Sequence, residues 1–91
     1  MKEYQYPLDL DWTINEMVTV MDMWETLEMA YEKGIDNVKF LKTYQRFKTV
    51  VPSIGEEKKL SKSFEQISGY SLYQAVQEAK KNNKKILKME E

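Results

Sequence analysis

The chain has 91 residues, 42% of them hydrophobic and 32% charged, a composition typical of one small globular domain. It contains no cysteine and no histidine, which excludes disulfides, thiol catalysis and cysteine-type zinc sites and removes the commonest general base near neutral pH. No apolar run reaches the roughly 18 residues that a membrane-spanning helix needs, and the first residues lack the apolar stretch of a secretion signal. We therefore expect a cytoplasmic protein with a single domain, residues 1–91.

The formal net charge of −1 conceals an uneven distribution of charge along the chain. Residues 1–33 carry two basic and eight acidic side chains, a balance of −6, whereas residues 34–91 carry twelve basic and seven acidic ones, a balance of +5. We expect these two parts to pack against each other with complementary charges.

Residues 1–12 are expected to form an extended N-terminal arm. Apolar and polar side chains alternate there, and Pro7 favours extended backbone at the residue before it. Alternation with a period of two is typical of a strand, but the chain offers no partner strand. We therefore predict that the arm lies across helices with these side chains inward: Tyr4, Tyr6, Leu8, Leu10 and Trp12.

Three motifs mark the starts of helices, because in each a hydroxyl precedes an acid or amide by three residues. They are Thr13-x-x-Glu16, Ser53-x-x-Glu56 and Ser71-x-x-Gln74. The first predicts a helix from about residue 14 to 33, which Gly34 can end in left-handed backbone. Helical spacing predicts its buried stripe: Met17, Met21, Trp24 and Tyr31, flanked by Ile14, Val20 and Leu27.

A second helix is predicted to begin after Asp36, a good N-cap, and to end before Pro52. Its expected buried face comprises Phe40, Leu41, Tyr44, Phe47 and Val51. A third helix is expected from about residue 54 to 68, with Gly69 as its stop. Its apolar stripe is narrow: Leu60, Phe64 and Ile67.

The fourth helix is predicted to follow Ser71, with these side chains on one side: Leu72, Ala75, Val76, Ala79, Ile86 and Leu87. The Asn82-Asn83 pair is a poor helix former. We expect the helix either to fray there, leaving residues 80–91 as a basic end, or to continue because Ile86 and Leu87 find a surface. The predicted fold class is all-α, a small compact cluster of four helices with an extended N-terminal arm.

Several motifs resemble those of a known family. The arm, Tyr4-x-Tyr6-Pro7-Leu8-Asp9-x-Asp11-Trp12, is one of them. The others are Ala30-Tyr31-Glu32-Lys33-Gly34, Tyr44-x-x-Phe47-Lys48-x-Val50-Val51-Pro52-Ser53 and Glu65-x-x-Ser68-Gly69-Tyr70-Ser71. To about residue 80 the chain is similar to the YktA-like family of small uncharacterised proteins from low-GC Gram-positive bacteria. The resemblance implies a compact all-helical fold and a cytoplasmic protein, and it carries over no activity and no catalytic residue.

Glu28 is the acidic side chain that stands out as a candidate functional group. Glu28 lies four residues after Trp24 and three before Tyr31, which places it within the apolar stripe of the first helix. Burial raises the pKa of a carboxyl group, which would make Glu28 a proton donor. We favour the alternative, a structural hydrogen bond to a tyrosine hydroxyl, an indole N–H or the arm, because an unpaired buried carboxylate is costly.

Asp9 and Asp11 have the spacing of half a divalent-metal site, but hard cations need more oxygen ligands than the arm supplies. We expect these acids to stabilise the positive dipole end of the following helix instead. The sequence also contains no glycine-rich phosphate loop, no nucleophile elbow and no metal-ligand cluster. We therefore predict no cofactor, no metal and no enzymatic activity.

Lys39, Lys42 and Arg46 form a basic stripe on the second helix, and five lysines follow in residues 80–88. Such cations could bind the phosphates of nucleic acid or another polyanion in a salt-dependent way. Against this, the isoelectric point of about 5.6 is far below that of a typical nucleic-acid-binding domain. Weak polyanion binding is therefore the alternative function, and nucleic acid is the less favoured partner.

We favour a protein–protein interaction domain. A domain of this size cannot cover all of its two tryptophans, six tyrosines and three phenylalanines, and exposed aromatics are preferred interface anchors. Methionine-rich helix faces adapt to varied partners, although filling the core is the more frequent role of methionine; Met23 and Met29 lie off the centre of the predicted stripe. We predict a docking surface that combines Tyr4 and Tyr6 of the arm with the outer methionines, Met23 and Met29. A homodimer is also open, because homodimers are the commonest assembly.

Overall fold

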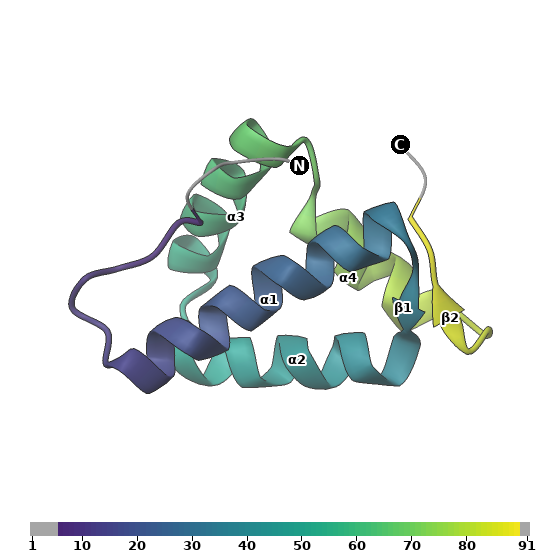
Figure 1. Ribbon diagram of the computed structural model, residues 1–91, viewed down its shortest axis with the longest axis horizontal. Coiled ribbons are helices and arrows are strands. Elements are labelled where there is room, and N and C mark those ends of the chain that lie inside the picture. The colour runs from purple at the N-terminus through teal and green to yellow at the C-terminus, as the bar shows by residue number, and fades with distance from the viewer. Residues whose placement is uncertain (1–5, 90–91) are drawn as a thin grey trace.

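The computed structural model describes residues 6–89, which form four helices and one pair of very short strands (Figure 1). In chain order the elements are α1 (Ile14–Glu32), β1 (Ile35–Asp36), α2 (Asn37–Val50), α3 (Ile54–Ser68), α4 (Leu72–Lys81) and β2 (Ile86–Leu87). The all-α prediction is confirmed, with the strand pair as an addition. None of the described helices is both long and apolar enough to cross a bilayer.

The helix starts lie where the capping motifs predict them. Thr13 accepts a hydrogen bond from the Glu16 N–H at 3.1 Å, and the Glu16 carboxylate accepts the Thr13 N–H at 2.8 Å, which completes a capping box. The hydroxyls of Ser53 and Ser71 cap α3 and α4 through the N–H groups three residues on. Each cap satisfies a backbone donor that the helix itself leaves unpaired, so these short polar residues fix where the helices begin.

An aromatic cluster forms the centre of the core. The Trp24 ring of α1 lies 5.6 Å from Phe47 of α2 and 4.8 Å from Phe64 of α3, measured between centroids. All three side chains are fully buried. Three helices therefore converge on one tryptophan, whose indole N–H donates to the carbonyl of Pro7 in the arm at 3.2 Å.

The buried face of α1 is centred differently from the predicted stripe. Its fully buried apolar side chains are Val20, Met23, Trp24, Leu27 and Ala30. Met17, Met21 and Tyr31 are only half-buried, and Ile14 is exposed. The prediction is therefore right for Trp24, Val20 and Leu27. Met17, Met21 and Tyr31 lie instead on a flank of the helix that other segments partly cover. Tyr31, for example, stacks on Tyr70 with ring centroids 4.6 Å apart.

The arm lies across the helices as predicted from Tyr6 to Leu8, and Tyr6, Leu8 and Trp12 pack against the core. Leu10 was expected to point inward, but 89% of it is exposed. The reason is a turn: the Asp9 carbonyl accepts the Trp12 N–H at 3.1 Å, and its carboxylate accepts the Asp11 N–H at 2.9 Å. The turn breaks the alternation of the arm and directs Leu10 into solvent. Residues 1–5 lie outside the described part of the chain.

The expectation that Ile86 and Leu87 continue a helix is wrong. Helix α4 ends at Lys81, and the two residues form β2, which pairs antiparallel with β1 in the register Ile35 with Leu87 and Asp36 with Ile86. Leu87 is buried, whereas Ile86 is half exposed. Residues 82–87, the turn after α4 together with β2, are called the C-terminal hairpin below, although the strand that pairs with β2 is β1.

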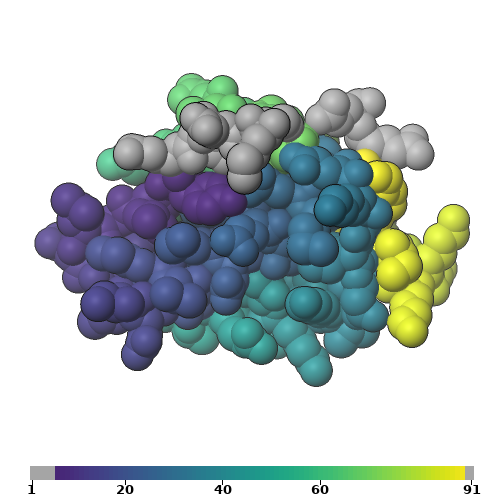
Figure 2. Space-filling view, in the orientation of Figure 1, coloured from purple at the N-terminus to yellow at the C-terminus, as the bar shows by residue number. Residues whose placement is uncertain are grey.

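The arm turn and the C-terminal hairpin lie at opposite ends of the molecule. Figures 1 and 2 show the purple arm at one end of the longest axis and the yellow hairpin at the other. The described chain measures 37 × 27 × 21 Å along its principal axes. Features at the two ends therefore cannot contact each other within one molecule.

Candidate functional site

Glu28 takes part in holding the arm. Its carboxylate accepts a hydrogen bond from the Tyr6 hydroxyl, and both side chains are half-buried. Burial and the neighbouring Glu28 carboxylate raise the pKa of Tyr6 well above its ordinary value. The tyrosine therefore stays protonated and keeps its hydrogen available to Glu28. This contact is of the structural kind that the sequence analysis favours for Glu28.

The structure describes three of the four residues predicted to form the docking surface, and these three differ in exposure. Met23 is fully buried in the core, so the expectation that it lies outside is wrong. Met23 lies in the core because the buried face of α1 is rotated relative to the predicted stripe. Met29 is 43% exposed, while Tyr6 is bonded to Glu28 and packs 5.9 Å from the Phe64 ring. Tyr4 lies outside the described residues.

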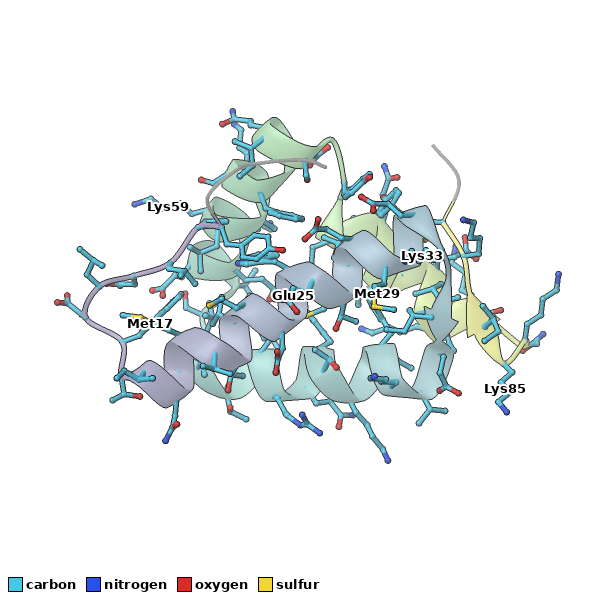
Figure 3. The ribbon with its side chains drawn as sticks, in the orientation of Figure 1. Met17, Glu25, Met29, Lys33, Lys59 and Lys85 are labelled. Carbon is cyan, nitrogen blue, oxygen red and sulfur yellow. The ribbon has the colours of Figure 1, made fainter. Side chains whose placement is uncertain are left out.

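The basic stripe on α2 is exposed but shares its surroundings with acids. Lys39, Lys42 and Arg46 line a hollow of about 280 Å³ together with Asp36. Lys39 and Arg46 also line an adjoining hollow of about 260 Å³, to which α1 contributes Asp22 and Glu25. Figure 3 shows Glu25 and Met29 on the same side of α1. These acids lower the positive potential that a polyanion would meet.

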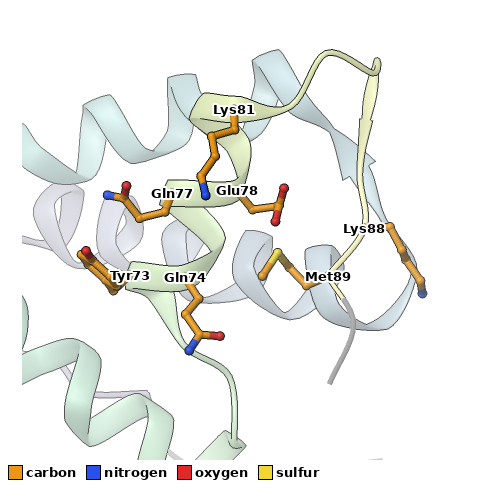
Figure 4. Close-up of a pocket in the computed structure, with 7 residues that line it drawn as sticks. All are labelled: Tyr73, Gln74, Gln77, Glu78, Lys81, Lys88 and Met89. Atoms are coloured by element: carbon orange, nitrogen blue, oxygen red, sulfur yellow. The ribbon is translucent and has the colours of Figure 1, made fainter.

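A third hollow, of about 470 Å³, lies between α4 and the segment after β2 (Figure 4). Its lining mixes amide, acidic and basic side chains: Tyr73, Gln74, Gln77, Glu78, Lys81, Lys88 and Met89. Lys88 is committed elsewhere, because its ammonium group donates to the Glu32 carbonyl at 2.9 Å. The mixture offers no single sign of charge and no nucleophile with an adjacent base.

The acids of the arm are not joined by further acidic side chains in the part of the chain that the structure describes. No three acidic side chains there come close enough to hold a metal ion. The Asp9 carboxylate instead accepts the Asp11 N–H within the arm turn.

The largest of the four hollows, about 620 Å³, lies between the arm turn and the first turns of α3. We call it the arm hollow, and its lining residues are Leu8, Asp9, Leu10, Asp11, Gly55, Glu56, Lys59 and Leu60. Ile54, the neighbour of Gly55, is 68% exposed, and Leu10 is more exposed still. Leu10 therefore stands in solvent at a concave surface, and Ile54 is exposed one residue away from its lining. This site could not be predicted from the alternating pattern of the arm, which placed Leu10 on the inward side.

A polar cluster fixes α3 against α2 and so positions one wall of the arm hollow. Glu57, in the first turn of α3, accepts a hydrogen bond from the Tyr44 hydroxyl at 2.7 Å. It also forms an ion pair with Lys48. Burial, together with the Glu57 carboxylate, raises the pKa of Tyr44 above its ordinary value. The two α2 side chains thereby hold Glu57 and the adjacent residues of α3 in one orientation.

Comparison with known proteins places the chain in a family. A family model described as "Uncharacterised protein family (UPF0223)" matches residues 3–88. A UPF0223 protein of Enterococcus faecalis is 61% identical over 89 residues, which cover 98% of this chain and 97% of the relative. Relatives from Streptococcus sanguinis and Bacillus cytotoxicus are 51% and 49% identical, over 91% and 96% of this chain and 90% and 99% of their own lengths.

These matches confirm the family type that the sequence motifs predict, small uncharacterised proteins of low-GC Gram-positive bacteria. They extend over the arm and all four helices, so the likeness is one of whole chains. The chain belongs to the UPF0223 family.

Proposed function

We propose that the chain is a small cytoplasmic protein-binding domain without catalytic activity, and that the arm hollow is its docking surface. The observation that carries the proposal is Leu10, which lines this hollow and is 89% exposed; Ile54, next in the chain to the lining residue Gly55, is 68% exposed. Burying one such side chain stabilises a complex by about 1.5–3 kcal/mol. Clustered exposed aliphatic groups on a concave surface are typical of interaction sites.

The chemistry of the other candidates favours binding over catalysis. The chain has no histidine or cysteine, and Glu28 accepts the hydrogen bond of the Tyr6 hydroxyl in a contact that anchors the arm. Polyanion binding is the second candidate, since Lys39, Lys42 and Arg46 are exposed along one helix face. We rank it lower because Asp36, Asp22 and Glu25 line the same hollows.

The test is affinity capture from an extract of the organism that encodes the protein, at low and high salt and after nuclease treatment. Three tagged baits are compared: the wild type, Leu10→Ser/Ile54→Ser, and Lys39→Gln/Lys42→Gln/Arg46→Gln. All the changed side chains are exposed, so we expect both variants to fold, as circular dichroism will check.

We expect a protein partner that the wild type and the lysine–arginine variant retain and the Leu10/Ile54 variant loses. Nuclease should leave this capture intact, because the partner is a protein. High salt should weaken it without abolishing it, because salt screens the charges around the hollow but not its apolar contacts. Loss of the captured material in the lysine–arginine variant or with nuclease would support polyanion binding instead. Equal capture by the Leu10/Ile54 variant, or no capture by any bait, would contradict the proposal.

A further inference from the structure

We infer that the arm hollow binds the C-terminal hairpin of a second copy of the chain. The inference rests on the proposed function, since it assigns a partner to the same surface. It starts from the charge of that surface. Asp9, Asp11 and Glu56 line the hollow, against Lys59 as its single base. Its apolar walls come from Leu8, Leu10 and Leu60. A complementary partner presents cations around one or two aliphatic side chains.

The C-terminal hairpin has this chemistry. Residues 80–88 contain five lysines and no acid. Lys84 and Lys85 are exposed, and Ile86 next to them is 50% exposed. Figure 3 shows Lys85 on the turn at the end of the molecule that lies opposite the arm. The hairpin therefore offers two ammonium groups and one aliphatic side chain at a protruding tip.

The hairpin is also held in a fixed shape. The Asn82 side-chain amide donates to the Ile86 carbonyl at 3.0 Å, and its oxygen accepts the Lys84 N–H at 3.0 Å. The Asn37 N–H donates to the Lys85 carbonyl at 2.8 Å. These bonds brace the turn from both sides. A braced tip loses little conformational entropy when it binds, which favours association.

The positions of the two surfaces require that the contact forms between molecules. The arm hollow and the hairpin lie at opposite ends of the 37 Å long axis. A hairpin therefore reaches the arm hollow of another copy and never its own. Because the contact joins two different surfaces, it links copies head to tail or in antiparallel pairs. The opposite net charges of the two parts of the chain, −6 and +5, favour the same arrangement.

The experiment measures mass by sedimentation as a function of protein concentration and salt. A hollow variant, Asp11→Lys/Glu56→Lys, makes the arm hollow positive while leaving the Asp9 side chain in its turn. A hairpin variant, Lys84→Glu/Lys85→Glu, makes the tip negative. The matched control, Lys39→Glu/Lys42→Glu, changes the net charge as much as the hairpin variant does but alters the α2 face.

We expect the wild type and the control to associate with rising concentration and to dissociate with added salt. Each reversed variant alone should associate at least tenfold more weakly. An equimolar mixture of the two should regain association, because each hairpin then meets a hollow of opposite charge. Gly55→Leu provides a second, uncharged test. A Cβ at Gly55 meets only Ser53 Oγ, at 3.8 Å, so a leucine fits there, changes the shape of the hollow's lining and should also weaken association.

A wild type that stays monomeric at every concentration would overturn the inference, as would reversed variants that associate like the wild type. Neither result bears on the capture experiment. If the wild type is monomeric and Leu10→Ser/Ile54→Ser still loses a captured protein, the hollow is a docking surface for another partner. If that variant loses nothing and the wild type is monomeric, the proposed function fails as well.

Discussion

Asn37 holds the C-terminal hairpin to the helices, so Asn37→Ala is the sharpest test of how that end of the molecule is stabilised. The side chain is buried, and its amide donates to the Ala79 carbonyl at 3.1 Å while its oxygen accepts the Asn82 amide at 3.1 Å. Alanine removes both bonds. It leaves the Ala79 carbonyl with a longer bond of 3.4 Å from the Asn82 N–H.

The expected loss follows from these contacts. Two neutral hydrogen bonds contribute about 1 kcal/mol each, and a poorly satisfied buried carbonyl adds up to about 1 kcal/mol. We therefore expect Asn37→Ala to lower the free energy of unfolding by about 2–3 kcal/mol, out of a total on the order of 5–13 kcal/mol for a chain of this length. The backbone bond from the Asn37 N–H to Lys85 survives the change, which keeps the loss within this range.

Urea unfolding followed by far-UV circular dichroism measures the difference, with an unchanged slope of free energy against urea. The control is Asn83→Ala, an exposed residue of the same turn, for which we expect a change within about 0.5 kcal/mol. If Asn37→Ala lowers the free energy of unfolding no more than Asn83→Ala does, the hydrogen bonds of Asn37 to Asn82 and Ala79 do not stabilise the hairpin, and the reasoning fails.

Three further predictions concern other elements. The pKa of the Tyr44 hydroxyl is raised in the folded protein. The stability that this hydroxyl contributes is therefore complete below about pH 10 and is lost as the pH rises toward the folded-state pKa. In Tyr44→Phe, the urea midpoint should accordingly fall less steeply above about pH 10 than in the wild type. Gly69 has φ +82°, so Gly69→Ala should destabilise by about 1 kcal/mol, whereas Gly55→Ala should be neutral or stabilise by up to about 1 kcal/mol, and thermal unfolding of the two separates them. Met23→Ala should cost about 2–5 kcal/mol in urea unfolding and Met29→Ala less than about 1 kcal/mol; similar losses would show that the assigned face of α1 is wrong.

The helix boundaries could be predicted from the sequence because they depend on local chemistry. A hydroxyl or carboxylate at an N-cap needs only the N–H groups of the next turn, as Thr13 and Asp36 show. A glycine at a helix end needs only its own freedom to adopt positive φ, as Gly34 does at +91°. Such signals are complete within four or five residues, so the starts of the four helices follow from them.

The parts that were mispredicted depend on segments far apart in the chain. Ile86 and Leu87 are spaced so that they could continue the apolar face of α4. They instead form β2, which pairs with β1 about fifty residues earlier in the chain, and no local sequence pattern predicts that pairing. Met23 was placed outside because two faces of α1 carry methionines. The face that is buried is decided by where α2 and α3 bring Phe47 and Phe64.

The arm hollow escaped sequence reasoning for a related reason. Leu10 fits an alternating pattern that predicts an inward side chain, and a two-residue turn at Asp9 overrides that pattern. The hollow then needs the start of α3, which Glu57 holds in place through Tyr44 and Lys48 of α2. Its acids belong to the arm and to α3, while the lysines that complement them belong to a hairpin at the other end of the molecule.

The uneven charge along the sequence indicates that two parts attract each other. The fold satisfies some of that attraction between α1 and α2, and the structure separates the arm hollow from the hairpin so that the remainder is available only to another molecule.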